Sequence, residues 1–314
     1  MTSETSTDVA VIIVGLNASR YVQECFASLD AAEWEGVSYE SIYIDNGSHD
    51  DTLAMLAREY PQVRVVANAT NLGFCKAANQ GAGLARSRYL FFLNDDTLVL
   101  GNAIAALVRH ADANPDLGAL GGRLLNTDGT EQYSGRRFPS PWNAILGRRS
   151  VLTKLFPHAG PVRDYLYKEL LARGQAFDVD WVSAAAVLFP AQVFTCIGGF
   201  AEDYYYWHEV IFCDRVRKVG KRVCLVPAAK IIHHEGKGSG ARPFAVRRKH
   251  IVDFHRGGYR CYCEHFELGP WNPLRFLVAA MLFTRATFLL AGAALSKGLK
   301  KHSPTQPASM TVPS

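Results

Sequence analysis

The sequence lacks an apolar N-terminal segment, since residues 1–8 are polar. A secretory signal needs such a segment, so we expect the protein to stay on the cytoplasmic side of the membrane. The 7 cysteines are odd in number and scattered, which indicates reduced thiols rather than a disulfide framework. Neither an internal repeat nor a low-complexity tract is evident, which argues against solenoid and fibrous proteins.

A pattern for nucleic-acid recognition is also missing. The formal net charge of +5 and the pI near 8.8 suit an anionic partner, which includes nucleotides and lipid headgroups as well as nucleic acids. The basic run at 247–250 is short, and neither a recognition helix nor an aromatic platform accompanies it. We therefore expect no nucleic-acid partner.

Apolar runs and helical patterns alternate in the first third of the chain. Four runs have the composition of buried strands: 9–14, 41–44, 63–67 and 89–93. Segments with helical spacing lie between them at 21–29, 52–60 and 76–86. This alternation predicts an α/β fold with a Rossmann-like, mostly parallel sheet flanked by helices.

The rest of the chain is less regular. A helix is expected at 100–113, and the Gly-, Arg- and Pro-rich stretch 121–149 is interpreted as an irregular loop or lid. Order returns with an apolar stretch at 179–189, a helical stretch at 209–219, a strand at 222–226 and the segment 230–236. We expect one domain over 9–240, with a nucleotide-binding half (9–113) and an acceptor half (114–240), followed by an extension over 241–314.

Polar residues follow each of the four apolar runs. They include Asn17, Asp45, Asn71 and the triplet Asn94-Asp95-Asp96. Ligands of such sheets bind outside the carboxyl ends of the strands, so these residues are expected at one edge. Carboxylates there suit Mg²⁺ or Mn²⁺ together with phosphate oxygens. Each cluster alone also fits solvated loop tips or ordinary capping turns.

Taken together, the motifs resemble the family 2 inverting glycosyltransferases, and within them the rhamnosyltransferase-like branch. The motifs occur in the family's order over about 9–240: 11–14, 44–48, 71–74, 93–97, 181–183, 198–200 and 233–236. The resemblance implies a GT-A fold, a nucleotide-sugar donor such as a dTDP- or UDP-sugar, and a divalent metal. It implies that the donor contacts Asn17, Asp45, Asn71, Asn94, Asp95, Asp96 and Trp181, that Asp96 and His233 hold the metal, and that Asp95 occupies a variable position.

Inversion at the sugar carbon requires a general base that accepts the acceptor's proton. The family has a Glu-Asp pair after the Gly-Gly-Phe turn, whereas this chain has His208-Glu209. Glu209 matches the catalytic position and is the expected base, with His208 as its substitute or partner. A structural role for Glu209 at a helix start is the alternative. A second acidic position of the family is Ile211 here, and the family's Thr-Tyr-Asn after the first strand is Gly15-Leu16-Asn17.

Residues 276–295 form an apolar stretch interrupted by Arg285 and flanked by basic residues. Its length approaches a bilayer span, but a central arginine costs about 2.5–3.5 kcal/mol on insertion scales. A helix lying in the interface of the inner or plasma membrane is the preferred interpretation, which makes the protein peripheral. Packing within the protein or a homo-oligomer, and a true span, remain the alternatives.

The expected activity is therefore metal-dependent transfer of a sugar to a lipid-linked or polysaccharide acceptor by an inverting hexosyltransferase. Rhamnose as the sugar rests on the resemblance alone. Two alternatives remain. A nucleotidyltransferase would ordinarily show a Gly-rich basic loop after the first strand, of which residues 15–20 are a poor version. A catalytically inactive sugar-nucleotide-binding protein would explain the altered acidic pair.

Overall fold

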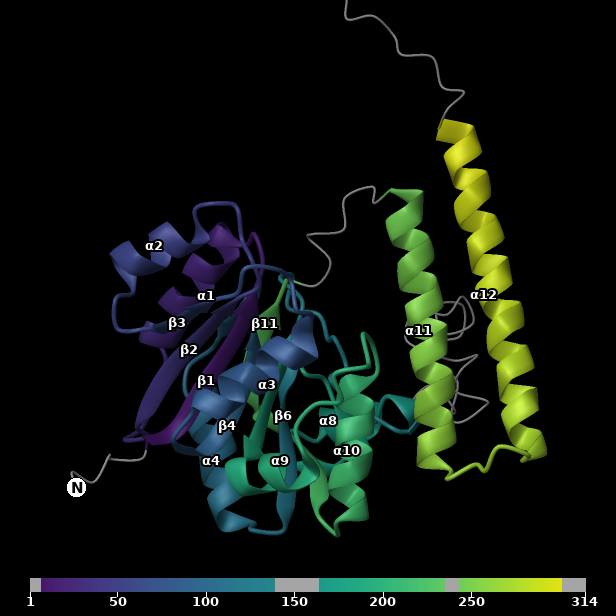
Figure 1. The fold of residues 1–314 in the computed structure, drawn as a ribbon. Helices are drawn as coiled ribbons and strands as arrows, with labels where there is room; N and C mark the ends of the chain where they lie inside the picture. Colours follow the sequence, from purple (N-terminus) through teal and green to yellow (C-terminus); the bar gives the residue numbers. More distant parts are fainter. Residues whose placement is uncertain (1–6, 139–163, 235–242, 301–314) are drawn as a thin grey trace, which may run out of the picture. The chain divides into compact units, whose positions relative to one another are not determined.

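The computed structural model describes residues 7–138, 164–234 and 243–300, with side chains up to residue 294. The chain divides into two compact units, residues 1–237 and 238–314. The first unit contains the sheet, and the second contains two long helices (Figure 1). Each unit is described by itself.

A nine-stranded sheet forms the first unit, in the order β3-β2-β1-β4-β10-β6-β11-β5, with β8 paired to β11. Its strands are β1 (Thr7–Gly15), β2 (Tyr39–Asp45), β3 (Arg64–Ala67), β4 (Ser87–Asn94), β5 (Thr97–Val99), β6 (Leu117–Leu125), β8 (Phe177–Asp178), β10 (Ala186–Pro190) and β11 (Arg222–His233). A small second sheet pairs β7 (Gly135–Arg136) with β9 (Trp181–Val182).

The first four strands are parallel, as their continuous apolar runs predict. Their register aligns the ends: Gly15 of β1 pairs with Asp45 of β2, and Val14 pairs with Asn94 of β4. β10 runs antiparallel between β4 and β6, and β11 is parallel to β6. The sheet is therefore mixed but mostly parallel, which confirms the predicted fold class.

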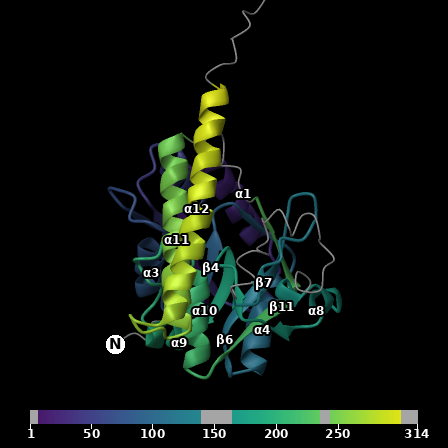
Figure 2. The same ribbon diagram turned by 90° about the vertical axis from the view of Figure 1, so that its right-hand side faces the viewer.

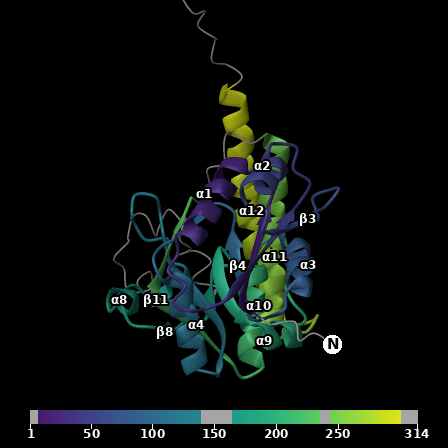
Figure 3. The ribbon, with the colours of Figure 1, turned by 90° about the vertical axis from the view of Figure 1, so that its left-hand side faces the viewer.

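Helices cover both faces of the sheet, and alternating residues of β1 point to each. Val9, Val11 and Ile13 belong to the core that also contains residues of α1 (Ser19–Asp30), α2 (Thr52–Glu59) and α4 (Ala103–Ala113). On the other face, Gly81 of α3 (Phe74–Leu84) lies against Ile12 and Ile44. Figure 3 shows α1 and α4 on one side of the sheet and α3 on the other.

An aromatic cluster fills the second face beside α3. Phe92 and Phe189 of the sheet meet Phe194, Phe200 and Phe212, with ring centroids 4.5–5.9 Å apart. Offset and edge-on contacts of this kind add to the burial of apolar area. The cluster packs α9 (Ala191–Ile197) and α10 (His208–Lys218) onto the sheet and so sets where α10 begins. The short helix α8 (Lys168–Ala172) completes the described helices of this unit.

The prediction that 121–149 is irregular is wrong for its first residues, because β6 extends to Leu125 as an interior strand. Its glycines serve packing rather than a loop. A Cβ on Gly121 would lie 2.7 Å from Val182, and one on Gly122 would lie 2.8 Å from the Ala229 carbonyl oxygen. The predicted lid at 139–149 lies outside the described residues. Residues 222–226 and 230–233 lie in one strand, β11, with a bulge between Val226 and Lys230.

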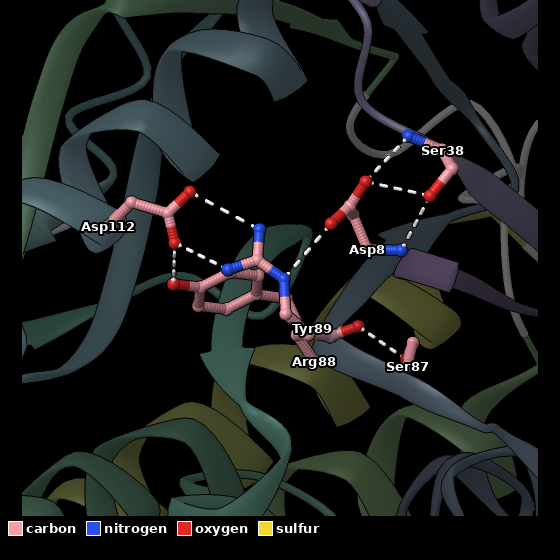
Figure 4. Close-up of polar contacts among 6 residues, drawn as sticks. All are labelled: Asp8, Ser38, Ser87, Arg88, Tyr89 and Asp112. Carbon is pink, nitrogen blue, oxygen red and sulfur yellow. Dashed lines mark hydrogen bonds and ion pairs between the residues drawn. The ribbon is translucent and has the colours of Figure 1, made fainter. Parts of the chain in front are cut away.

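A polar clamp holds the amino ends of β1 and β4 together (Figure 4). The Arg88 guanidinium bonds both carboxylate oxygens of Asp112 at 2.8 and 3.3 Å, and its Nε donates to Asp8 at 3.0 Å. Tyr89 also donates its hydroxyl to Asp112, and the other Asp8 oxygen accepts two hydrogen bonds from Ser38. The clamp lies at the amino ends of the strands, whereas Asp45 and Asn94 lie at the carboxyl ends of theirs.

The second unit consists of α11 (Phe244–His265) and α12 (Pro273–Lys300), which run antiparallel side by side (Figure 2). Two arginines of α12 tie them together. Arg275 donates to the Tyr259 hydroxyl at 2.6 Å, and Arg285 lies 3.0 Å from Nε2 of His255. His255 Nδ1 is 2.7 Å from the Ile251 carbonyl, which can only accept, so Nε2 has the lone pair that Arg285 needs.

Candidate functional site

The loops after β1 and β2 form a connected turn at the carboxyl edge of the sheet. Asn17 has a left-handed backbone (φ 52°), which asparagine tolerates. Its amide N–H donates to Ser48 Oγ at 2.8 Å, and its side-chain oxygen accepts from the N–H of His49 at 2.7 Å. Asn17 therefore braces the turn that follows Asp45.

Asp45 is buried at the end of β2, and its two carboxylate oxygens differ. Oδ2 accepts the backbone N–H groups of Gly47 and Ser48 at 3.0 and 2.8 Å, which is a capping turn. Oδ1 is buried and has no hydrogen-bond partner among the described residues. A buried acceptor without a partner is costly, so Oδ1 is suited to a donor on a ligand. Oδ2 of Asp45 thus has the capping role, and Oδ1 is the oxygen suited to bind a ligand.

The loop after β3 is fixed by side-chain amides. Asn68 and Gln80 exchange two hydrogen bonds at 3.0 and 3.2 Å, and Asn46 Oδ1 accepts from Asn68 and from the N–H of Leu72 at 3.4 Å. Asn71 is exposed and accepts from the N–H of Gly73. Asn71 therefore lies on the same edge as Asp45, at the entry to α3.

Asp95, at the end of β4, lies in a different environment from its neighbour Asp96. Burial, and then the charge of Asp96, raise the pKa of Asp95 to about 7, although the backbone N–H of Leu16 donates to it. A Cβ on Gly15 would collide with the Tyr43 hydroxyl and lie 2.9 Å from Asp95 Oδ2. Tyr43 thus occupies the space above Gly15. Asp95 lies beside them and is only partly exposed.

Asp96 meets His233 across the site, from the far end of β11. Asp96 Oδ1 lies 3.3 Å from His233 Nε2, and Asn94 Nδ2 lies 3.3 Å from the same nitrogen. Both Asp96 and His233 keep some exposure. Among the described residues no group of three His, Cys, Asp or Glu side chains could hold a metal by itself. Mg²⁺ and Mn²⁺ are, however, commonly bound by one or two carboxylates plus substrate phosphates, so this pair fits a metal that the donor's diphosphate completes.

Gln132 is a further residue beside His233, and no sequence motif indicates it. It is buried and lies in the stretch interpreted as irregular. Its side chain bonds both the Nδ1 nitrogen and the carbonyl oxygen of His233. A lone glutamine in a Gly-rich stretch has no sequence signal of its own, since only the fold brings it to His233.

Glu209 lies in the first turn of α10, and His208 begins the helix. The Glu209 side chain is 24% exposed, and its Oε2 atom is buried without a hydrogen-bond partner, 3.5 Å from His208 Nδ1. The His208 ring is held between Phe74 and Phe200. Burial lowers the pKa of His208, so its imidazole is neutral at pH 7. Glu209 is thus a carboxylate with one unsatisfied oxygen, held near the start of α3.

Trp181 differs from the other candidates in its placement, and so do the aromatic residues 204–207 that precede Glu209. Trp181 is buried in β9, its indole N–H donates to the Arg137 carbonyl at 2.9 Å, and Arg136 lies over its ring. Tyr204 is also buried, whereas Tyr205 is exposed. The structure therefore gives Trp181 a packing role and leaves its contact with a donor as a prediction.

The fold and this edge define a glycosyltransferase of the GT-A class. The chain belongs to glycosyl transferase family 2, whose model matches residues 10–163. It is similar to the N-acetylglucosaminyl-diphospho-decaprenol L-rhamnosyltransferase of Mycobacterium tuberculosis, with 28% identity over 90% of this chain and 94% of that protein. The succinoglycan biosynthesis protein ExoO of Rhizobium meliloti is 32% identical over 78% of this chain and 65% of its own length. The chain is thus a rhamnosyltransferase-like member of the family.

Solved structures agree on the fold. The mannosyltransferase PcManGT from Pyrobaculum calidifontis, in complex with GDP-Man and Mn²⁺, matches 97% of this chain and 78% of its own with a TM-score of 0.57 at 16% identity. GalNAc-T7 with UDP, GalNAc and Mn²⁺ matches 73% of this chain and 44% of its own with a TM-score of 0.54 at 15% identity. These likenesses confirm the predicted GT-A fold.

Proposed function

We propose that the protein transfers a sugar from a nucleotide-diphosphate donor to a hydroxyl of a lipid-linked acceptor, with inversion at the sugar carbon. The observation that supports this most is the Asp96–His233 pair, a carboxylate oxygen and an imidazole nitrogen 3.3 Å apart at the edge where donors of such folds bind. Asp45 Oδ1 adds a buried acceptor on the same edge, suited to a base or ribose N–H or O–H group.

Asp96 and His233 would hold a Mg²⁺ or Mn²⁺ ion, which neutralises charge on the departing diphosphate when bound. Glu209 is the proposed base, because its Oε2 has no internal hydrogen-bond partner and can accept the acceptor's proton. The His208 ring is neutral and packed between aromatic rings, so Glu209 rather than His208 is the base that we propose.

Rhamnose is the first donor sugar to test, because the relative that covers 90% of this chain is named an L-rhamnosyltransferase. Its name also gives a diphospho-decaprenol acceptor, which is a polyprenyl lipid. We therefore propose a dTDP- or UDP-activated sugar as donor and a polyprenyl diphosphate sugar as acceptor. The finer choice between nucleotides depends on contacts around Asn17 and Asp45.

The test is a panel of nucleotide sugars, each incubated with the full-length protein, Mn²⁺ or Mg²⁺ and a short-chain polyprenyl diphosphate sugar. We expect one donor to turn over and Asp96→Ala to reduce metal-dependent donor binding at least 10-fold. Asp51→Ala, which changes an exposed aspartate in front of α2, is the control. Donor binding without turnover by the wild-type protein would select the non-catalytic alternative, and no binding of any donor would refute the proposal.

Membrane attachment through the second unit is part of the proposal. Residues 273–294 of α12 are long and apolar enough to cross a membrane, and little of this stretch is buried within the protein. Arg285, which interrupts this stretch, is bonded to His255 and lies over the Phe254 ring, so α11 partly shields its charge. Phe283 and Phe288 are each 74% exposed. We propose that these rings enter the headgroup boundary of an anionic membrane.

Vesicle sedimentation tests this attachment. Replacing Phe283 and Phe288 by Asp should shift most of the protein from anionic vesicles to the supernatant, whereas Val219→Asp, at an exposed valine of the first unit, should not. Release by alkaline carbonate would identify a peripheral helix, and retention a true span. Equal sedimentation of the double variant and the wild type would contradict the proposal.

A further inference from the structure

The Gln132 side chain has an orientation that its neighbours determine. Its amide nitrogen donates to the His233 carbonyl oxygen at 2.6 Å and to Asn126 Oδ1 at 2.8 Å. The backbone carbonyl can only accept a hydrogen bond, so the nitrogen of Gln132 must point toward it. The usual ambiguity between oxygen and nitrogen in a glutamine side chain is thereby removed.

The other contact of Gln132 agrees with this orientation. Thr130 donates its hydroxyl hydrogen to Asp128 at 2.6 Å, so its oxygen is left to accept from Asn126 Nδ2 at 2.8 Å. Asn126 therefore presents its oxygen to Gln132. The relay starts at a carboxylate and ends at a carbonyl, and both of these groups are acceptors only.

The fixed orientation decides which nitrogen of His233 carries the proton. Gln132 Oε1 lies 2.9 Å from His233 Nδ1, and an amide oxygen can only accept. Nδ1 must therefore be protonated. In the neutral imidazole the lone pair then belongs to Nε2.

The Nε2 lone pair is directed at the proposed metal position. In the neutral Nδ1–H tautomer, Asn94 Nδ2 donates toward this lone pair at 3.3 Å, and Asp96 Oδ1, also 3.3 Å away, faces it as a second acceptor. Two acceptors that face each other repel unless a cation lies between them. With the opposite tautomer, the Nε2–H group would donate to Asp96 and occupy the position of the metal.

We propose that Gln132 is a positioning residue for the metal ligand His233: it holds the imidazole as the Nδ1–H tautomer and leaves Nε2 free to bind a divalent cation. This inference rests on the proposed function, since it assigns the cation to the donor site. Outer-shell partners of histidine ligands fix the tautomer and the ring orientation, and their loss typically weakens metal binding 10- to 100-fold.

The first test reads the tautomer without metal. Nitrogen-15 NMR of the histidine rings distinguishes protonated from unprotonated nitrogens, and the His233→Asn spectrum identifies the His233 signals. We expect a protonated Nδ1 and an unprotonated Nε2 in the wild type, since the Gln132 amide oxygen only accepts. Gln132→Leu should lose this preference, with ring dynamics or the Nε2–H form appearing. A wild-type His233 that carries its proton on Nε2 and not on Nδ1 would overturn the proposal.

The second test measures Mn²⁺ binding in the presence of dTDP or UDP, by the electron paramagnetic resonance signal of the free ion. Gln132→Leu should bind Mn²⁺ about 10-fold more weakly or worse. Gln23→Leu, the same change at an exposed glutamine, should bind Mn²⁺ as the wild type does. Equal Mn²⁺ affinity of Gln132→Leu and the wild type would refute the positioning role alone. A wild type that binds no Mn²⁺ with either nucleotide would instead contradict the metal dependence of the proposed function.

Discussion

The polar clamp at the amino ends of β1 and β4 gives a prediction about stability that is independent of the candidate site. Replacing Arg88 by Met keeps the length of the side chain and removes the guanidinium that bonds Asp8 and Asp112 (Figure 4). The Arg88 and Asp112 side chains are 49% and 43% exposed, and Asp8 is 30% exposed. Both carboxylates can therefore hydrate in the variant, and neither becomes a buried unpaired charge.

The magnitude follows from this exposure. Solvent-exposed ion pairs contribute about 0.2–1 kcal/mol each, so two pairs give a loss of about 0.5–2 kcal/mol in the free energy of unfolding. For a domain of about 150–250 residues, 1 kcal/mol corresponds to about 2–4 °C in melting temperature. Arg86→Met, at an exposed arginine whose guanidinium donates to its neighbour's carbonyl, is the matched control.

The loss should depend on pH with a definite sign. Hydrogen bonds from Arg88 lower the pKa of Asp112, and hydrogen bonds from Ser38 and then Arg88 lower the pKa of Asp8 from 3.8. A lowered carboxyl pKa stabilises the folded state above the unfolded value, and this contribution disappears as the pH falls through the folded value. Urea unfolding should therefore separate Arg88→Met from the wild type at pH 7 and bring them together as the pH falls below about 4.

Donor turnover should be unchanged, since the clamp lies at the sheet edge opposite Asp45 and Asn94. Three results would refute this reasoning: a loss above about 3 kcal/mol, an equal loss in Arg86→Met, or a difference from the wild type that grows on acidification.

Two further predictions concern Asp45 and the glycines of β6. Asp45→Asn should weaken dTDP or UDP binding in calorimetry about 10-fold or more, since a hydrogen bond to a charged group contributes about 1.5–3 kcal/mol, and Asp51→Ala should bind normally; unchanged affinity would remove Asp45 from the nucleoside site. Gly122→Ala should cost about 1–3 kcal/mol, because its Cβ would lie 2.8 Å from the Ala229 carbonyl oxygen, whereas Gly83→Ala in the open part of α3 should be neutral or stabilising. Equal melting temperatures of these two variants would contradict the packing role assigned to Gly122.

The parallel half of the fold follows from the sequence because local patterns determine it. Runs such as 9–14 and 89–93 are apolar throughout, and they became β1 and β4 with polar residues at their ends. The sequence predicts an irregular stretch at β6, because Gly121 and Gly122 are typical of turns. In the structure these two positions have no room for a side chain, because Val182 and Ala229, which lie far away in the sequence, approach them closely. Small residues selected by tertiary packing cannot be separated from turn residues by local pattern.

In the candidate site, too, local patterns predict some residues, and tertiary packing alone determines others. The motifs place Asp45, Asp96 and His233, since each lies at or just after the carboxyl end of a strand. The partner that orients His233 is Gln132, about 100 residues earlier in the chain, and the group that fills the space over Gly15 is Tyr43 of the next strand. Arg285 likewise appeared as an interruption of an apolar helix until its bond to His255 was seen. Each of these contacts joins two elements whose pairing cannot be predicted from the hydrophobic periodicity of the sequence.

The most direct test of the central claim compares Glu209→Gln with the wild type, using the donor that turns over, the polyprenyl acceptor and Mn²⁺. For Glu209→Gln we predict a donor affinity within a few-fold of the wild type and a transfer rate reduced about 10²- to 10⁴-fold. For the wild type we predict a product with inverted anomeric configuration. Normal transfer by Glu209→Gln, or retention of configuration, would contradict the assignment of Glu209 as the base of an inverting glycosyltransferase.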